Sequence, residues 1–65
     1  MLSMKERLES ALSSAWSENN RAYKEFGHAC KRRDQEGIKY WESAWRYWSG
    51  RIDEISAQLK KEVNG

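Results

Sequence analysis

Hydrophobic residues in the second half of the chain recur at alternating steps of three and four. The positions in this series are Ile38, Trp41, Trp45, Trp48, Ile52, Ile55 and Leu59. A strand would send alternate side chains to opposite faces, whereas a helix gathers this spacing into one apolar seam. The pattern therefore predicts a helix over about residues 34–63 whose seam packs against another helix.

The first half of the chain carries the same alternation. Its members are Leu8, Leu12, Ala15, Asn19, Ala22, Phe26 and Ala29. Ser3 and Glu6 have the spacing of a capping box, so we expect this helix to span about residues 3–33. Gly27 lies inside it and disfavours helix by about 1 kcal/mol relative to alanine, which leaves a break at Gly27 as the rival interpretation. Continuity is favoured because Ala29 keeps the phase.

The two predicted helices are joined by a very short connection. Lys31, Arg32 and Arg33 suit the C-terminus of one helix, and Asp34 suits the N-cap of the next. A tight turn forces the helices to fold back antiparallel. If paired residue numbers sum to about 67, small residues of the first helix mostly oppose large ones of the second. We predict an all-α fold, an antiparallel two-helix hairpin forming a single domain over residues 1–65.

Asn19 interrupts the apolar series at a core position. Its simplest role is to fix the register, with its amide accepting the indole N–H of Trp48. A role in binding a ligand is the alternative.

More apolar surface is present than one hairpin can bury. Trp16 and Tyr23 flank the seam of the first helix, and Tyr40, Ala44 and Tyr47 widen that of the second. We expect these five residues to form a partner or dimer interface, most simply in a homodimer that makes a four-helix bundle. The alternatives are a different protein partner, or tyrosines that only decorate a solvated face.

Composition argues against several classes of protein. Cys30 and His28 are the only cysteine and histidine among 65 residues, so the sequence predicts no disulfide, metal site or cofactor. No constellation suggests an enzyme. No stretch is apolar enough to span a membrane, and charged residues interrupt the N-terminal region, so we expect a soluble cytoplasmic protein.

Charge distribution supplies the main alternative function. The formal net charge is only +2, but cations gather toward the predicted turn. Lys31, Arg32, Arg33 and Lys39 are therefore candidates for steering a partner or contacting a polyanion. In this alternative the chain is a small dimeric RNA-binding regulator, similar in length and hairpin plan to the Rop family of plasmid copy-number regulators. No RNA-contacting motif of that family aligns here.

The length, the richness in charge and the segment MLSMKERLESALSSAW resemble short accessory proteins of lambda-like bacteriophages, encoded between the exonuclease and excisionase genes. The resemblance implies an early protein that alters host or phage development through protein contacts in the host cytoplasm. It brings no functional residues with it. We therefore expect a non-enzymatic interaction or regulatory module.

Overall fold

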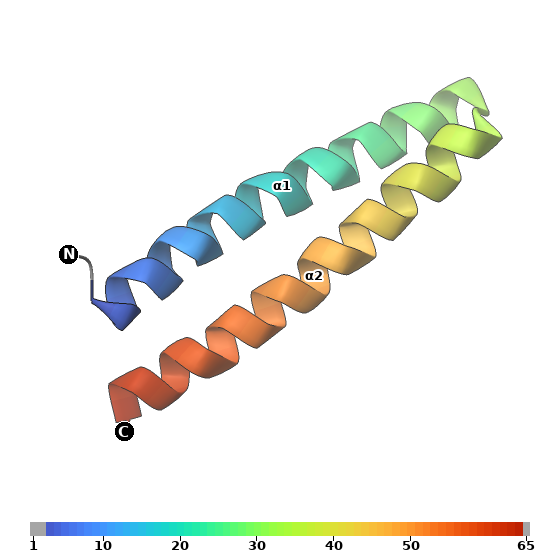
Figure 1. The fold of residues 1–65 in the computed structure, drawn as a ribbon. Coiled ribbons are helices and arrows are strands. Elements are labelled where there is room, and N and C mark those ends of the chain that lie inside the picture. Colours follow the sequence, from blue (N-terminus) through green and yellow to red (C-terminus); the bar gives the residue numbers. More distant parts are fainter. Residues whose placement is uncertain (1–2, 65) are drawn as a thin grey trace.

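The structure, a computed structural model, describes residues 3–64, and the side chains up to residue 62. Helix α1 spans Met4–Arg32 and helix α2 spans Gln35–Asn64, and all described residues outside the termini and the short turn are helical. The helices run antiparallel and pack along their length, so both chain ends lie at one end of the molecule (Figure 1). The prediction of two long helices folded into a hairpin is confirmed.

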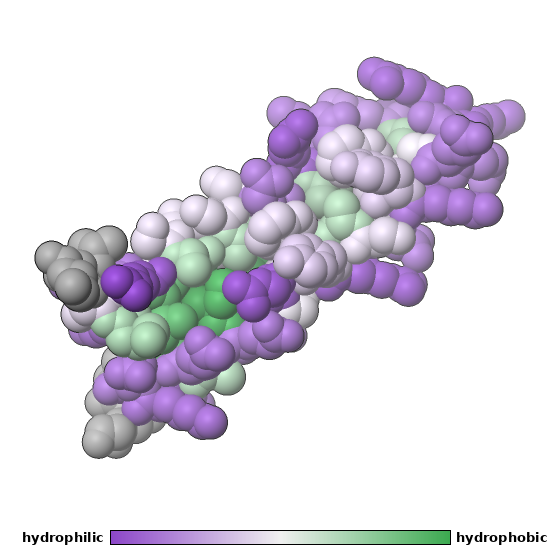
Figure 2. Space-filling model, viewed as in Figure 1, coloured by the Kyte–Doolittle hydropathy of each residue, from purple (hydrophilic) through white to green (hydrophobic). Residues whose placement is uncertain are grey.

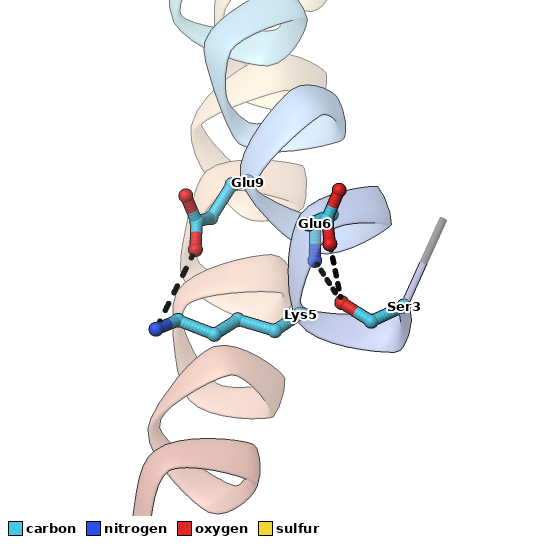
Figure 3. A network of polar contacts seen from close by, with 4 residues as sticks. All are labelled: Ser3, Lys5, Glu6 and Glu9. Carbon is cyan, nitrogen blue, oxygen red and sulfur yellow. Dashed lines mark hydrogen bonds and ion pairs between the residues drawn. The ribbon is translucent and has the colours of Figure 1, made fainter. Parts of the chain in front are cut away.

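Helix α1 begins with the predicted Ser3 cap, and the Glu6 side chain contacts the Ser3 hydroxyl, where the capping box has it accept from the Ser3 backbone N–H. The backbone N–H of Glu6 donates to Ser3 Oγ at 3.2 Å, and Ser3 Oγ donates in turn to Glu6 Oε1 at 3.3 Å (Figure 3). One turn further on, Lys5 and Glu9 form an exposed ion pair at 4.0 Å. The side-chain oxygen of Ser3 satisfies a backbone donor that a helix N-terminus otherwise leaves free.

The turn is built from two successive caps. Arg33 adopts the left-handed conformation with φ 58°, and the backbone N–H groups of Arg33 and Asp34 donate to the carbonyls of Cys30 and Ala29 at 3.1 and 3.0 Å. This pattern is a Schellman motif. Asp34 then caps α2, because its Oδ1 accepts from the Gly37 N–H at 3.1 Å. The prediction of Asp34 as the N-cap of the second helix is confirmed. Arg33, expected to end the first helix, is a turn residue, so α1 ends one residue earlier than predicted.

Gly27 does not break α1, which is continuous across it. Gly37 has a different role. A Cβ at position 37 would lie 2.5 Å from Asp34 Oδ2 and 3.2 Å from the Cβ of Ala29. The missing side chain of Gly37 therefore allows the cap and the helices to approach closely.

The best-buried part of the core lies toward the chain ends. Leu8, Ala15, Ile52 and Ile55 form its buried cluster, and half-buried Leu12, Trp48 and Leu59 pack against it. On one face of the molecule, apolar side chains concentrate near this end, whereas hydrophilic residues dominate the turn end (Figure 2). Closer to the turn, only the alanines Ala22 and Ala29 are buried.

The observed register agrees with the predicted sum of about 67. Contacts between the helices join Tyr23 to Trp45 and Asn19 to Ser49, each pair summing to 68. The prediction that the tryptophans of the second helix's apolar seam, Trp41, Trp45 and Trp48, fill the core is only partly correct. Trp41 and Trp48 are half-buried, and Trp45 is 37% exposed. Two helices form a single layer, so a large indole opposite a small alanine remains open to water on one side.

The shape explains why so little is buried. The molecule measures 47 × 19 × 12 Å, and its radius of gyration is 14.7 Å, against about 11 Å for a compact domain of this length. Its thinnest dimension is close to the diameter of one helix. A slab of this kind leaves both of its broad faces exposed.

Candidate functional site

Exposed aromatic side chains form two separate surfaces. The first, here called the indole face, comprises Trp16, Tyr23 and Trp45. The second, the tyrosine edge, comprises Tyr40 and Tyr47. Four of these five side chains are at least half exposed, the exception being Trp45. Large exposed aromatics are the residues that most often anchor protein interfaces.

The indole face brings both helices together. The rings of Tyr23 from α1 and Trp45 from α2 lie 6.0 Å apart, tilted at 53°. Trp16 is 50% exposed and lies two helical turns before Tyr23 on α1. One turn after Trp16, Tyr23 and Trp45 come Asn20, Gly27 and Ser49, which carry no charge. These three neighbours are uncharged, whereas Asp53 places a carboxylate beside Trp16 on the same face.

The two tyrosines of the tyrosine edge pack against Trp41 and Trp48. Tyr40 meets Trp41 edge-on at 4.8 Å, and Tyr47 meets Trp48 edge-on at 5.0 Å. The guanidinium of Arg21, on α1, lies 5.9 Å from the centre of the Trp41 ring, within the range of a cation–π contact. Each tyrosine ring therefore packs against the indole that follows it in the chain, and more than half of its surface stays exposed.

The five residues expected to form one interface do not lie on one surface. On a helix with about 100° per residue, Tyr47 lies about 160° around α2 from Trp45. Tyr40 and Tyr47 consequently face the opposite side of the slab from Trp16 and Tyr23, and half-buried Ala44 lies on the tyrosine side. The spacing of residues in the sequence predicted both flanking stripes. It did not show that the two stripes face opposite sides of the molecule once the helices pack together.

Arg21 also departs from the local ion pair that its four-residue spacing to Glu25 favours. Its guanidinium lies over Trp41 instead, and Glu25 approaches His28 at 4.0 Å. The pair of Glu42 and Arg46 forms as its spacing predicts, at 3.1 Å.

Asn19 is buried, as expected, but its hydrogen bonds differ from the prediction. The amide nitrogen donates to Ser49 Oγ at 2.9 Å and to the carbonyl oxygen of Trp45 at 3.4 Å, in place of a bond to the Trp48 indole. Both bonds reach α2, so the side chain ties the two helices at mid-length. This geometry supports the expected role in fixing the register.

Beside Asn19 the surface is hollowed into a pocket of about 160 Å³ on the indole face. It is lined by Trp16, Asn19, Ser49, Ile52 and Asp53. Ile52 is buried and supplies apolar surface, whereas Asp53 is exposed and forms no ion pair among the described residues. Sequence reasoning placed Asn19 and Ile52 in the core and gave no role to Ser49 or Asp53. The sequence feature that pointed to this role is that Ser49 and Asp53 lie one and two helical turns after Trp45.

The basic turn end is exposed. Lys31, Arg32, Arg33 and Lys39 are all on the surface, and within the described part of the chain none of them has a carboxylate partner within 4 Å. Lys31 and Arg32 occupy the last turn of α1, where cations are favoured by the helix dipole. The helix dipole accounts for their position. Their charged groups nevertheless remain available to a binding partner.

Over residues 3–64 no three His, Cys, Asp or Glu side chains gather closely enough to hold a metal ion. Nor does either described helix contain a stretch of sufficient length and hydrophobicity to cross a bilayer.

The hairpin exposes more surface than a folded monomer of its size normally does. Its accessible area is 5303 Å², and scaling with mass gives about 4,300 Å² for a typical 7.7 kDa protein. The excess of about 1,000 Å² is comparable to the roughly 800 Å² that each partner contributes to a standard interface.

Comparison of the chain with protein-family models, with curated proteins and with solved structures finds no match.

Proposed function

We propose that this protein is a non-enzymatic interaction module that pairs through its indole face into a four-helix bundle and presents its tyrosine edge to a protein partner. The observation that carries the proposal is the division of the exposed aromatics between two opposite sides of a slab with excess surface. One side suits self-association, and the other stays free for recognition.

The indole face suits a second copy because it exposes three aromatic rings whose neighbours one turn on are uncharged. Interface centres are depleted of charged residues and enriched in aromatic ones. Asn20, Gly27 and Ser49 provide small or neutral surroundings for the rings of this face. Pairing there would shield Trp45, the core indole that the hairpin alone leaves 37% exposed.

The tyrosine edge suits a different protein. Its two rings lie edge-on against Trp41 and Trp48 and leave more than half of their surface open to a partner. Arg21 lies over Trp41 on the same side, and Arg51 pairs with Glu54 at 2.9 Å one turn beyond Tyr47. Aromatic anchors with a charged rim are typical of transient recognition surfaces.

The partner class follows from the resemblance to early proteins of lambda-like phages. On that basis we place the module in the host cytoplasm, where it regulates host or phage development by binding a host or phage factor.

A second candidate function is RNA binding in the manner of the Rop-like hairpins. The observation in its favour is the group of exposed cations without carboxylate partners at the turn end, Lys31, Arg32, Arg33 and Lys39. Contacts with phosphates would make this binding strongly dependent on salt.

Two double variants separate these functions. Tagged protein is used to capture its partner from the cell in which it is made, with and without nuclease. Changing Tyr40 and Tyr47 to alanine should abolish capture of the protein partner, whereas changing Arg32 and Arg33 to alanine should leave it intact. Capture of RNA alone, lost in the arginine variant and retained in the tyrosine variant, would favour the second function.

A further inference from the structure

We propose that the pocket beside Asn19 is filled by the indole of Trp16 from a second copy, so that two Trp16 side chains form the centre of the dimer. This inference rests on the proposed self-association and adds its location and its central contact. It makes the pocket a reciprocal site that one chain cannot complete alone.

The chemistry of the pocket calls for an apolar group that carries a hydrogen-bond donor. Both bonds of the Asn19 amide nitrogen are directed within the hairpin, to Ser49 and Trp45, which leaves the amide oxygen as an acceptor. Asp53 adds a carboxylate with no cation beside it among the described residues, and Ile52 adds apolar surface. An indole combines a flat apolar body with a single N–H donor and no acceptor.

Trp16 is an exposed side chain of this kind at the rim of the same pocket. Half of its surface faces solvent, and among the described residues it packs against no other aromatic ring, unlike Tyr23, Tyr40 and Tyr47. Trp16 is half-exposed, so covering the rest of it would remove roughly half of the 150–250 Å² that a tryptophan can bury, about a tenth of the excess surface of each chain.

Symmetry brings the pocket against its own copy. Helix α1 spans Met4–Arg32 and helix α2 spans Gln35–Asn64, so their midpoints fall at residue 18 and between residues 49 and 50. The pocket residues straddle both midpoints. When two hairpins overlap along their whole length about a two-fold axis, mid-length meets mid-length whether the hairpins run parallel or antiparallel. Trp16 of one copy then reaches the Asn19 and Asp53 of the other.

Sedimentation equilibrium of the full chain and two matched pairs of variants test the proposal. Trp16→Ala should weaken the dimer at least about tenfold, because it removes the central anchor twice. Tyr47→Ala, an exposed aromatic on the other side, should change the dimer dissociation constant less than about twofold. In the second pair, Asp53→Arg should disrupt the dimer by filling the pocket and placing two cations near the axis, whereas Glu54→Arg should not. Circular dichroism at the same concentrations checks that each variant keeps its helices.

The outcomes separate this inference from the proposed function. A wild-type chain that stays monomeric overturns both. A wild-type dimer that survives Trp16→Ala and Asp53→Arg, or that is weakened equally by the control variants, overturns the Trp16 site but leaves self-association standing. Loss of dimerisation in Trp16→Ala and Asp53→Arg alone supports the Trp16 site. If Trp16→Ala loses its helices, the comparison of Asp53→Arg with Glu54→Arg decides.

Discussion

Tyr23 and Trp45 join the two helices through an aromatic contact, with ring centres 6.0 Å apart at a tilt of 53°. Trp45 lies opposite Ala22 in the register, so Tyr23 covers part of an indole that the alanine cannot cover. We expect Tyr23→Ala to reduce the free energy of unfolding by about 1 kcal/mol, and Tyr23→Phe, which keeps the ring, to change it little. Urea denaturation at one fixed protein concentration measures both. Equal stability of the two variants would mean that the ring contact contributes nothing.

The three glycines within the helices should respond differently to alanine. A Cβ at Gly37 would collide with the Asp34 carboxylate, whereas at Gly27 and Gly50 it would meet no atom within 4 Å. Gly27→Ala and Gly50→Ala should therefore each stabilise the hairpin by up to about 1 kcal/mol through helix propensity. Gly37→Ala should gain little or nothing, because disturbing the Asp34 cap loses about 1 kcal/mol and offsets the gain in helix propensity. Thermal unfolding followed by circular dichroism compares the three variants, and a stabilisation by Gly37→Ala equal to that by Gly27→Ala would contradict the turn geometry.

Arg33 occupies a backbone conformation that favours glycine. Its φ of 58° costs a side-chain-bearing residue about 1 kcal/mol. Arg33→Gly should raise the free energy of unfolding by roughly that amount. Arg32→Gly, one residue earlier and still helical, removes the same charge but should lower stability. If both variants shifted stability in the same direction, charge rather than backbone conformation would be the cause.

The stability of the hairpin should depend on the hydrogen bonds that the Asn19 amide donates to the second helix. Asn19→Asp keeps the shape but places a carboxylate against Ser49 and the Trp45 carbonyl. We expect a loss of about 2–3 kcal/mol, against about 1 kcal/mol for Ser49→Ala, which removes one neutral bond. A double-mutant cycle between Asn19→Ala and Ser49→Ala measures their coupling. No coupling would show that the register is set by apolar packing alone.

Local chemistry made most of the fold predictable. Ser3, Asp34 and the spacing of the apolar residues carried enough information to locate both helices, because caps and periodicity are properties of neighbouring residues. The left-handed turn at Arg33 was not anticipated, since this conformation usually falls on glycine. The sequence still favoured the short connection through the charges on either side of it.

The candidate site was harder to predict. Trp45 shares the period of the core residues, so nothing local distinguished it from a buried residue, and its exposure follows only from the thinness of a two-helix layer. Tyr23 and Tyr47 both appeared as flanking residues, but their assignment to opposite sides depends on how the two helices face each other. The pocket at Asp53 arises between elements and has no sequence motif.

Sedimentation velocity of the unmodified chain from about 1 to 100 μM, the range of ordinary transient and stable dimers, shows whether two hairpins pair in solution. We expect a species of twice the 7.7 kDa chain mass, in reversible exchange with the monomer at the lowest concentrations. A single 7.7 kDa species throughout this range would contradict it, because the indole face would then remain exposed to water.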